Sequence, residues 1–250
     1  MDAEAAGAFY DRSYFHGGDY ADYESSRLFL QRNFDVFARR MRRIHRGRRL
    51  LEVGCAYGYF LDIVQRDWDV EGIDISEDAI RSARHRFGER VRCGDLLSQP
   101  LRSSAYDWVV AWDTIEHVDE PRAYVQRVGE LLTPGGYVAL TTGDVSSLVA
   151  RLRSRRWRLL TPPSHLTFFS RTGMRRMLND AGFEDIRIST TGYRRSLDFV
   201  FYRLLGGHRC RRIMAASPSL HRLLQDWGFY LNLFDVMFVT ARKPLPAGSP

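Results

Sequence analysis

The chain has 250 residues, of which 44% are hydrophobic and 27% charged, a composition typical of a folded domain rather than of a disordered chain. No apolar run is long enough to cross a bilayer, and the N-terminus carries acids where a secretory signal would carry basic residues. The three cysteines, Cys55, Cys93 and Cys210, fit neither a zinc-binding pattern nor a disulfide framework. We therefore expect a cytoplasmic protein.

The net charge of +7 raises the question of a nucleic-acid partner. Only one of the 37 basic residues, Lys243, is a lysine. Codon composition explains this skew toward arginine more simply than selection for an RNA-binding surface. The basic clusters are also local, at 39–49, 151–158 and 209–212. The charge pattern therefore disfavours nucleic acid as the substrate.

Strands and helices alternate through the first two thirds of the chain. An N-terminal helix is indicated by apolar residues at near-helical spacing over 25–44. The predicted strands that follow cover 49–54, 70–75, 91–93, 106–111 and 137–142. The predicted helices between them cover 59–66, 77–87 and 121–132, and a Thr-Pro-Gly-Gly turn at 133–136 ends the last one. This alternation predicts an α/β fold, with a parallel sheet that helices cover on both faces.

The last third of the chain changes character. A helix is predicted over 172–181, ended by the C-cap glycine Gly182, and strands are predicted at 183–191 and 237–242. Between these strands, 195–234 is rich in Leu, Phe, Tyr and Arg and is expected to be a helical insertion. We expect the following domain organisation: an N-terminal helical cap at 1–47, a core at 48–194 and 235–243, the insertion at 195–234, and a tail at 244–250.

A glycine-containing loop between the first strand and the next helix is the most informative motif. Its form is Glu52-x-Gly54-x-x-x-Gly58. Gly54 lets the chain turn sharply as it leaves the strand, and Gly58 removes a side chain where a ligand would approach the loop. The spacing differs from the G-x-G-x-x-G that binds a pyrophosphate. An acid at position 52 would also oppose phosphate and suit an amine.

Two further acids follow the next two predicted strands. Asp74 lies 20 residues after Gly54 and could accept hydrogen bonds from both hydroxyls of a ribose. Asp95 ends the third strand, where its carboxylate could accept from an exocyclic adenine amine. Because open α/β sheets bind ligands at the carboxyl ends of their strands, Glu52, Asp74 and Asp95 predict a nucleoside site with an adjacent amine.

These motifs, in this order, resemble those of the class I S-adenosylmethionine-dependent methyltransferases. The resemblance covers about 48–192 and includes Gly94-Asp95-Leu96, the segment 111–118 and the turn 131–136. The segment 164–170, with Ala181-Gly182-Phe183, resembles the bacterial small-molecule subgroup related to ubiquinone-type O-methyltransferases. The family implies a Rossmann-like seven-stranded sheet whose last strand is antiparallel.

The resemblance also implies S-adenosyl-L-methionine as the cofactor, S-adenosyl-L-homocysteine as the product, and a small-molecule methyl acceptor. The expected cofactor-binding residues are those of the motifs, with an N-terminal aromatic that could close over the cofactor. They are Tyr14, Glu52, Gly54, Cys55, Ala56, Gly58, Tyr59, Phe60, Asp74, Ile75, Gly94, Asp95, Leu96, Trp112, Asp113 and His117.

Two histidines are candidates for the catalytic base. His117 follows the fourth strand, where the resemblance places the reactive methyl, and His165 lies in a Pro-Pro-Ser-His loop after the fifth strand. A neutral imidazole could take a proton from an acceptor hydroxyl as the methyl transfers. Either histidine could instead be structural, with His117 packed under the cofactor loop and His165 anchoring its own loop.

The remaining residues bear on a possible metal site and on alternative functions. Asp113 and Asp144 follow neighbouring strands, but the chain lacks the paired acid and amide of catechol-type methyltransferases, so we expect no metal. The segment 195–234 could be a substrate cap, a subunit interface or a peripheral membrane contact, and the sequence specifies no oligomeric state. The favoured function is O-methylation of a small molecule. The alternatives are an rRNA or tRNA methyltransferase and a non-catalytic cofactor-binding module.

Overall fold

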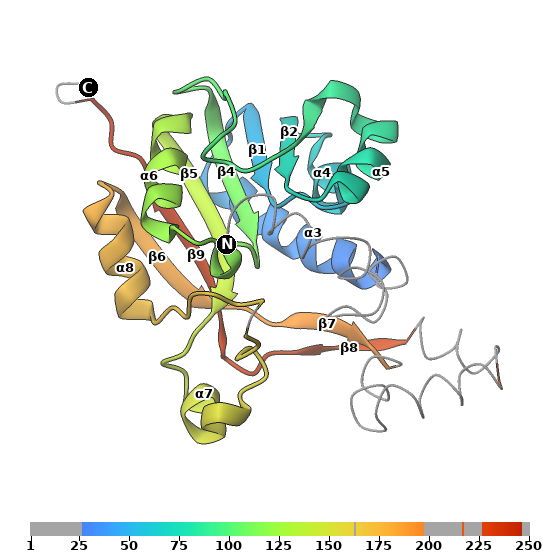
Figure 1. Cartoon of the computed structure of the whole chain (residues 1–250), viewed down its shortest axis with the longest axis vertical. Coiled ribbons are helices and arrows are strands. Elements are labelled where there is room, and N and C mark those ends of the chain that lie inside the picture. The colour runs from blue at the N-terminus through green and yellow to red at the C-terminus, as the bar shows by residue number, and fades with distance from the viewer. Residues whose placement is uncertain (1–26, 163, 198–216, 218–226, 247–250) are drawn as a thin grey trace.

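A seven-stranded sheet forms the centre of the computed structural model, which describes residues 27–162, 164–197, 217 and 227–246 (Figure 1). The strand order is β3-β2-β1-β4-β5-β9-β6, and β9 is antiparallel to both of its neighbours. The pairs among β1 to β5 are parallel, so their carboxyl ends share one edge. The predicted sheet is therefore confirmed. Its strands are β1 (Arg49–Val53), β2 (Asp69–Asp74), β3 (Val91–Cys93), β4 (Tyr106–Trp112), β5 (Leu132–Gly143), β6 (Glu184–Thr190) and β9 (Val236–Arg242).

Helices cover both faces of this sheet. One face packs against α3 (Arg27–Ile44), α4 (Tyr59–Val64) and α5 (Glu77–Phe87), and the other against α6 (Pro121–Leu131) and α8 (Arg171–Asp180). Side chains alternate along β4, with Trp108 and Val110 in the first core and Val109 and Ala111 in the second. A strand buried on both faces reads as a continuous apolar run. This is why 106–111 is recognisable as a strand from its sequence.

Side-chain caps fix the start of two of these helices. The Ser76 hydroxyl accepts from the amide of Ala79 at 3.4 Å at the start of α5. The Ser170 hydroxyl accepts from the amide of Gly173 at 3.1 Å at the start of α8. Each cap satisfies an amide that has no partner within the first helical turn. Ser76 therefore holds α5 directly after the carboxyl end of β2.

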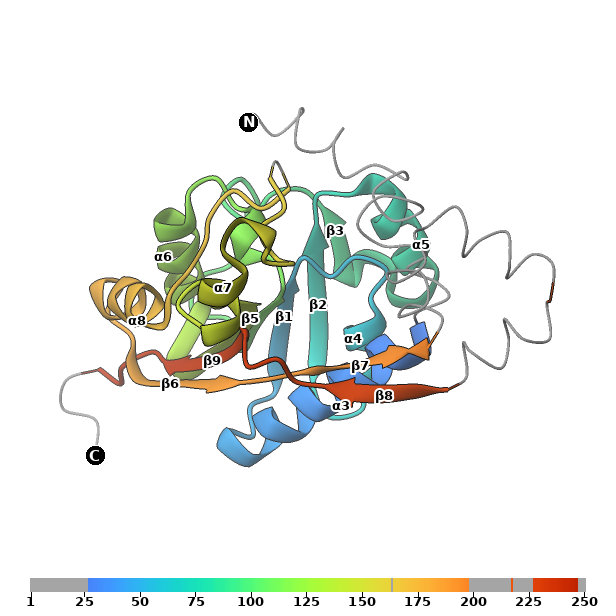
Figure 2. The same cartoon turned by 90° about the horizontal axis from the view of Figure 1, so that it is seen from below.

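Two features differ from the sequence-based expectation. The predicted turn at 133–136 is the first part of β5, where the pairing with β4 shifts register and Gly135 has φ +77°. The described ends of the 195–234 insertion form strands, because β7 (Tyr193–Ser196) pairs antiparallel with β8 (Gly228–Leu231) (Figure 2). Asn33 on α3 holds β7 through two hydrogen bonds to the backbone of Arg194. The expected helices of the insertion, and Tyr14, lie outside the described residues.

A segment after β5 crosses the carboxyl edge of the sheet before α8. It contains α7 (Leu148–Arg153) and is anchored to the start of β9 by the buried carboxylate of Asp235. That carboxylate accepts from the Trp157 indole nitrogen at 2.9 Å and from the Arg158 guanidinium at 2.8 Å. Among the residues that the structure describes, no helix has the length and apolar character needed to span a bilayer.

Candidate active site

The loop between β1 and α4 is tied to the end of β2. The amides of Gly54 and Cys55 both donate to the carbonyl of Ile73, at 2.8 and 3.1 Å. The amide of Ala56 donates to one carboxylate oxygen of Asp74 at 2.7 Å. Ala56 has φ +44°, a conformation that costs an alanine energy and that these bonds hold in place. The loop and Asp74 are therefore held together by hydrogen bonds at the carboxyl edge of the sheet.

Both glycines of the loop have backbone angles that favour glycine, with φ +77° at Gly54 and +73° at Gly58. A Cβ atom at Gly54 would lie 2.5 Å from the hydroxyl of Thr114, a residue that follows β4. A Cβ atom at Gly58 would lie 2.7 Å from the ring of Phe87 at the end of α5. In the structure, close packing against α5 explains why position 58 is a glycine. The expectation from the sequence was instead that a ligand approaches the loop there.

The Asp74 carboxylate has a second backbone partner, because the amide of Ser76 donates to its other oxygen at 2.9 Å. Burial raises the pKa of Asp74, and the amides of Ser76 and Ala56 oppose that rise. A carboxylate has about four acceptor positions. Backbone amides use some of these positions, and the others suit the ribose hydroxyls expected from the resemblance.

Glu52 lies on β1 and is almost completely buried, at 2% exposure. Its Oε2 atom has no hydrogen-bond partner among the described residues. Burial, and then the nearby carboxylates of Asp74 and Asp62, raise the pKa of Glu52. A buried acceptor without a donor is costly, and a cationic donor beside Glu52 would remove that cost. The side chain therefore suits the amine that the sequence analysis expects at this position.

The segment after β3 continues the same edge. The amide of Gly94 donates to the carbonyl of Asp74 at 2.8 Å, and Gly94 has φ +141°. Asp95 is half-buried, and one of its carboxylate oxygens accepts from the amide of Leu97 at 2.8 Å. Leu96 is buried in the core formed with α6 and α8. Asp74 and Asp95 thus follow neighbouring strands at one edge, as predicted.

Several residues assigned to the cofactor on sequence lie in the core instead of lining an open surface. The Trp112 ring is 7% exposed and packs against Phe37, Phe60 and Phe238, with ring centroids 4.8 to 6.0 Å apart. These contacts account for the position of the ring, whereas its indole nitrogen is buried without a hydrogen-bond partner among the described residues. The other buried members of the predicted set are Glu52, Cys55, Ala56, Gly58, Tyr59, Phe60 and Leu96.

Asp113 follows β4 in a left-handed conformation, with φ +49°. The Tyr193 hydroxyl donates to its carboxylate, at 2.8 and 2.7 Å from the two oxygens, and the Thr141 hydroxyl lies 2.8 Å from one of them. Burial and the Asp113 charge raise the pKa of Tyr193, so its hydroxyl keeps the proton that it donates. Sequence reasoning missed Tyr193 because nothing in its local pattern links it to a residue 80 positions earlier.

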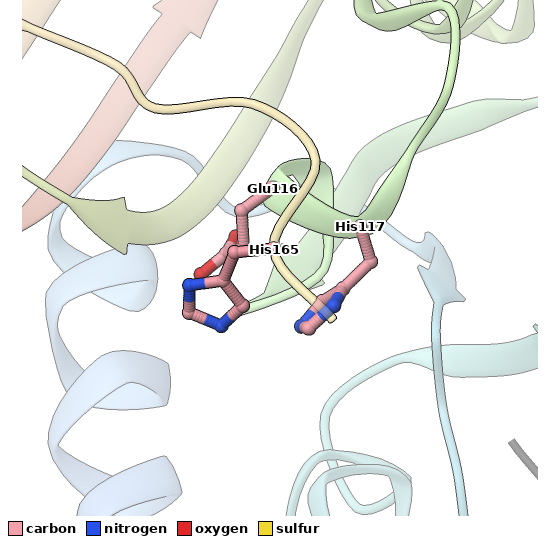
Figure 3. Close-up of side chains that lie close together, drawn as sticks. All are labelled: Glu116, His117 and His165. Carbon is pink, nitrogen blue, oxygen red and sulfur yellow. The ribbon is translucent and has the colours of Figure 1, made fainter. Parts of the chain in front are cut away.

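The two candidate bases lie side by side, with ring centroids 4.8 Å apart (Figure 3). His117 ends the short 3-10 turn η2 (Ile115–His117), and His165 comes from the loop before α8. The Nδ1 atom of His117 lies 2.7 Å from the carbonyl oxygen of Ser164. The Nδ1 atom of His165 lies 2.7 Å from the carbonyl oxygen of Leu159. The structure therefore brings both predicted histidines together at the carboxyl edge of the sheet.

Glu116 completes this group, and the sequence analysis gave it no role. Its side chain is 5% exposed, and its Oε2 atom has no hydrogen-bond partner among the described residues. Burial, and then the charge of Asp113, raise the pKa of Glu116. Its backbone carbonyl accepts from the amides of Leu166 and Thr167, at 2.8 and 3.1 Å, which fixes the His165 loop against η2. In the sequence, only the position of Glu116 next to His117 indicated that it could belong to the site.

Comparison with known families identifies the domain. A family model described as a methyltransferase domain matches residues 23–188, which is more than half of the chain. The chain belongs to this methyltransferase family. This match confirms the resemblance to S-adenosylmethionine-dependent methyltransferases that the sequence motifs indicate. The residues of the chain fit that cofactor, because the unpartnered oxygen of Glu52 suits the ammonium group and the remaining acceptor positions of Asp74 suit the ribose.

The similar proteins include enzymes of two biosynthetic routes. A ubiquinone biosynthesis O-methyltransferase of Leptothrix cholodnii is 33% identical over 104 residues, 38% of this chain and 44% of that protein. A biotin biosynthesis bifunctional protein of Teredinibacter turnerae is 27% identical over 231 residues, 80% of this chain and 40% of that protein. The matches therefore span less than half the length of these relatives.

The fold is shared with solved structures of low sequence identity. One is a SAM-dependent methyltransferase from Archaeoglobus fulgidus, which is 19% identical with a TM-score of 0.60. The alignment covers 88% of this chain and 99% of that one. At this identity, the likeness establishes the fold alone.

Substitution of Asp74 by alanine is expected to weaken binding of S-adenosylmethionine at least tenfold. The variant loses the acceptor for the ribose hydroxyls, and each charge-assisted bond contributes about 1.5–3 kcal/mol. Calorimetric titration measures the affinity, and circular dichroism checks the fold, since Asp74 also holds the Ala56 and Ser76 amides. The wild type should discriminate against a 2′-deoxy analogue and Asp74→Ala should not. Equal discrimination by both proteins would remove Asp74 from the ribose.

Proposed function

We propose that this enzyme methylates an oxygen atom of a small molecule. The observation that carries the proposal is the His117–His165 pair at the carboxyl edge of the sheet, where His117 follows β4 and His165 lies in the loop between β5 and α8. Transfer to a hydroxyl requires a group that receives its proton, and an imidazole suits that role near neutral pH. The similarity to proteins named ubiquinone biosynthesis O-methyltransferases supports oxygen as the acceptor.

When bound, S-adenosylmethionine supplies an electrophilic methyl group on a sulfonium centre. The chain contributes alignment: the rigid loop, Glu52 and Asp74 hold one reactant in place, and fixed orientation of two reactants is worth about 7–11 kcal/mol of the barrier. The Nδ1 proton of each histidine is committed to a backbone carbonyl, so the lone pair of the neutral ring is on Nε2. That atom is the one that could receive the acceptor proton, a contribution of about 10²–10⁴ in rate.

The surface charges support a small acceptor over a nucleic acid. Within the basic cluster 39–49, Arg42 pairs with Asp67, Arg48 with Asp69 and Arg49 with Glu71. These acids reduce the positive potential that a phosphate backbone would require. The proposal also includes recognition of the acceptor, with the 1–47 cap and the 195–234 insertion as candidate segments for it.

The test uses cell extract as the source of the unknown acceptor. The protein is incubated with extract and methyl-labelled S-adenosylmethionine, and mass spectrometry follows the label. We expect a labelled small molecule whose methyl is bound to oxygen. Label in RNA would support the nucleic-acid alternative. Cofactor binding without transfer to any fraction would support the non-catalytic alternative.

A further inference from the structure

Glu116, His117 and His165 offer three ligand atoms that all lie within 4.8 Å of one another. Two come from consecutive residues of one turn and the third comes from a loop 48 residues later. Figure 3 shows the three side chains converging from these two segments. The residue types, two imidazoles and one carboxylate, are those that bind zinc and other divalent transition metals in three-ligand sites.

The hydrogen bonds of the two rings favour ligation. A backbone carbonyl can only accept, so the Nδ1 atoms of His117 and His165 must carry the protons in their 2.7 Å contacts with Ser164 and Leu159. This tautomer places a lone pair on each Nε2 atom. Metal-ligating histidines almost always donate their other N–H to a carbonyl or carboxylate, which fixes the ring orientation. Both rings already have that arrangement.

The carboxylate and its surroundings complete the donor set. Glu116 is buried with an oxygen that has no hydrogen-bond partner among the described residues, so a cation beside it would remove a desolvation cost. Asp113, three residues earlier, adds negative charge near the group. The bonds from Leu166 and Thr167 to the Glu116 carbonyl hold the two segments together without any ion. The site is therefore partly pre-formed.

We propose that Glu116, His117 and His165 bind one divalent transition-metal ion, with Zn²⁺ as the best match to two nitrogens and one carboxylate oxygen. Three protein ligands leave a fourth position open, as in catalytic zinc sites. Bond lengths of about 2.1 Å bring ligand atoms to about 3.4 Å apart in a tetrahedron, so the side chains must close slightly around the ion. This proposal replaces the sequence-based expectation of no metal, which considered only Asp113 and Asp144.

The ion would change what the histidines do in the proposed reaction. With their Nε2 atoms bound to the metal, the rings no longer take up a proton. An acceptor hydroxyl in the open position would be polarised and lose its proton to solvent. Its oxygen would then form the new bond to the methyl carbon while the carbon–sulfur bond breaks and sulfur keeps the electron pair. This role rests on the proposed function, whereas binding of the ion does not.

The test is titration of Zn²⁺ into chelator-treated protein, followed by calorimetry. We expect one equivalent to bind, and substitution of a ligand to weaken it at least about tenfold, since loss of a mere outer-shell partner already costs 10–100-fold. The variants are Glu116→Gln and His165→Gln. The controls are His85→Gln, a histidine exposed on α5, and Cys93→Ser, a half-buried thiol. Both controls should bind the ion as the wild type does.

A second measurement on the unmodified chain keeps the test valid if a variant fails to fold. Co²⁺ in place of Zn²⁺ should give the visible absorption of a four-coordinate site without thiolate ligands. Absence of stoichiometric binding, or equal affinity in the ligand variants and the controls, would overturn the proposal. The binding readouts need no methyl acceptor, so they stand even if O-methylation is wrong. Methyl transfer with and without chelator then reports whether the ion takes part in the reaction.

Discussion

Substitution of Gly58 by valine is expected to abolish binding of S-adenosylmethionine. Gly58 has φ +73°, which is strained for any residue with a side chain and most strained for a β-branched one. The first added atom would also lie 2.7 Å from the ring of Phe87, so the loop or the end of α5 must move. Either movement displaces the backbone that connects Glu52 to α4. Calorimetric titration with S-adenosylmethionine measures the loss.

Gly182 provides a matched control for this variant. It also has a positive φ, +82°, but an added Cβ there meets no atom within 4 Å. Gly182→Val therefore introduces comparable backbone strain, on the order of 1–2 kcal/mol, without the steric clash. We expect it to lower the melting temperature and to bind the cofactor with nearly unchanged affinity. Unchanged affinity in Gly58→Val, at equal protein stability, would contradict the role of the loop.

Much of the sheet could be predicted because several strands are short, mostly apolar segments that end in, or are followed by, a glycine or an acid. The run 106–111 and the end of β2 at Asp74 are examples. The 193–196 and 228–231 strands could not be predicted in the same way. The side chains of 228–231 are exposed, and the 193–196 strand is held by contacts with α3, such as those of Asn33, rather than by an alternating local pattern.

The candidate site was predictable where two motifs follow adjacent parallel strands. Gly54 and Asp74 are such a case, because the loop and the end of β2 are neighbours in any parallel pair of strands. Glu116 was not, since its proximity to His165 depends on the path of a loop 49 residues later. The same holds for Tyr193 and Asp113, which meet across 80 residues. The ring of Trp112 packs in the core, which its position in the motif did not indicate, and its contact with the cofactor stays a prediction.

The largest effect on turnover is expected from the histidine pair. At least one of His117→Gln and His165→Gln should lower kcat about 100-fold or more, because a positioned base contributes about 10²–10⁴ to transfer from a hydroxyl. Affinity for S-adenosylmethionine should stay within a few-fold, since Glu52 and Asp74 are unchanged. The assay compares each variant with His85→Gln, using chelator-treated protein so that the rate reports the imidazoles without a bound ion.

The pH dependence of the residual rate distinguishes a lost base from a general loss of structure. If a histidine receives the acceptor proton, the variant should recover activity as pH rises, because hydroxide or prior ionisation of the acceptor replaces the base. A variant that is merely misfolded would stay inactive at every pH and would also lose cofactor affinity. Rates close to wild type in both variants would show that alignment alone carries the reaction, with an acceptor that is already ionised or is a neutral amine. No residue of this chain would then support oxygen as the methyl acceptor, because Glu52, Asp74 and the loop are expected to position the cofactor in the same way for any acceptor.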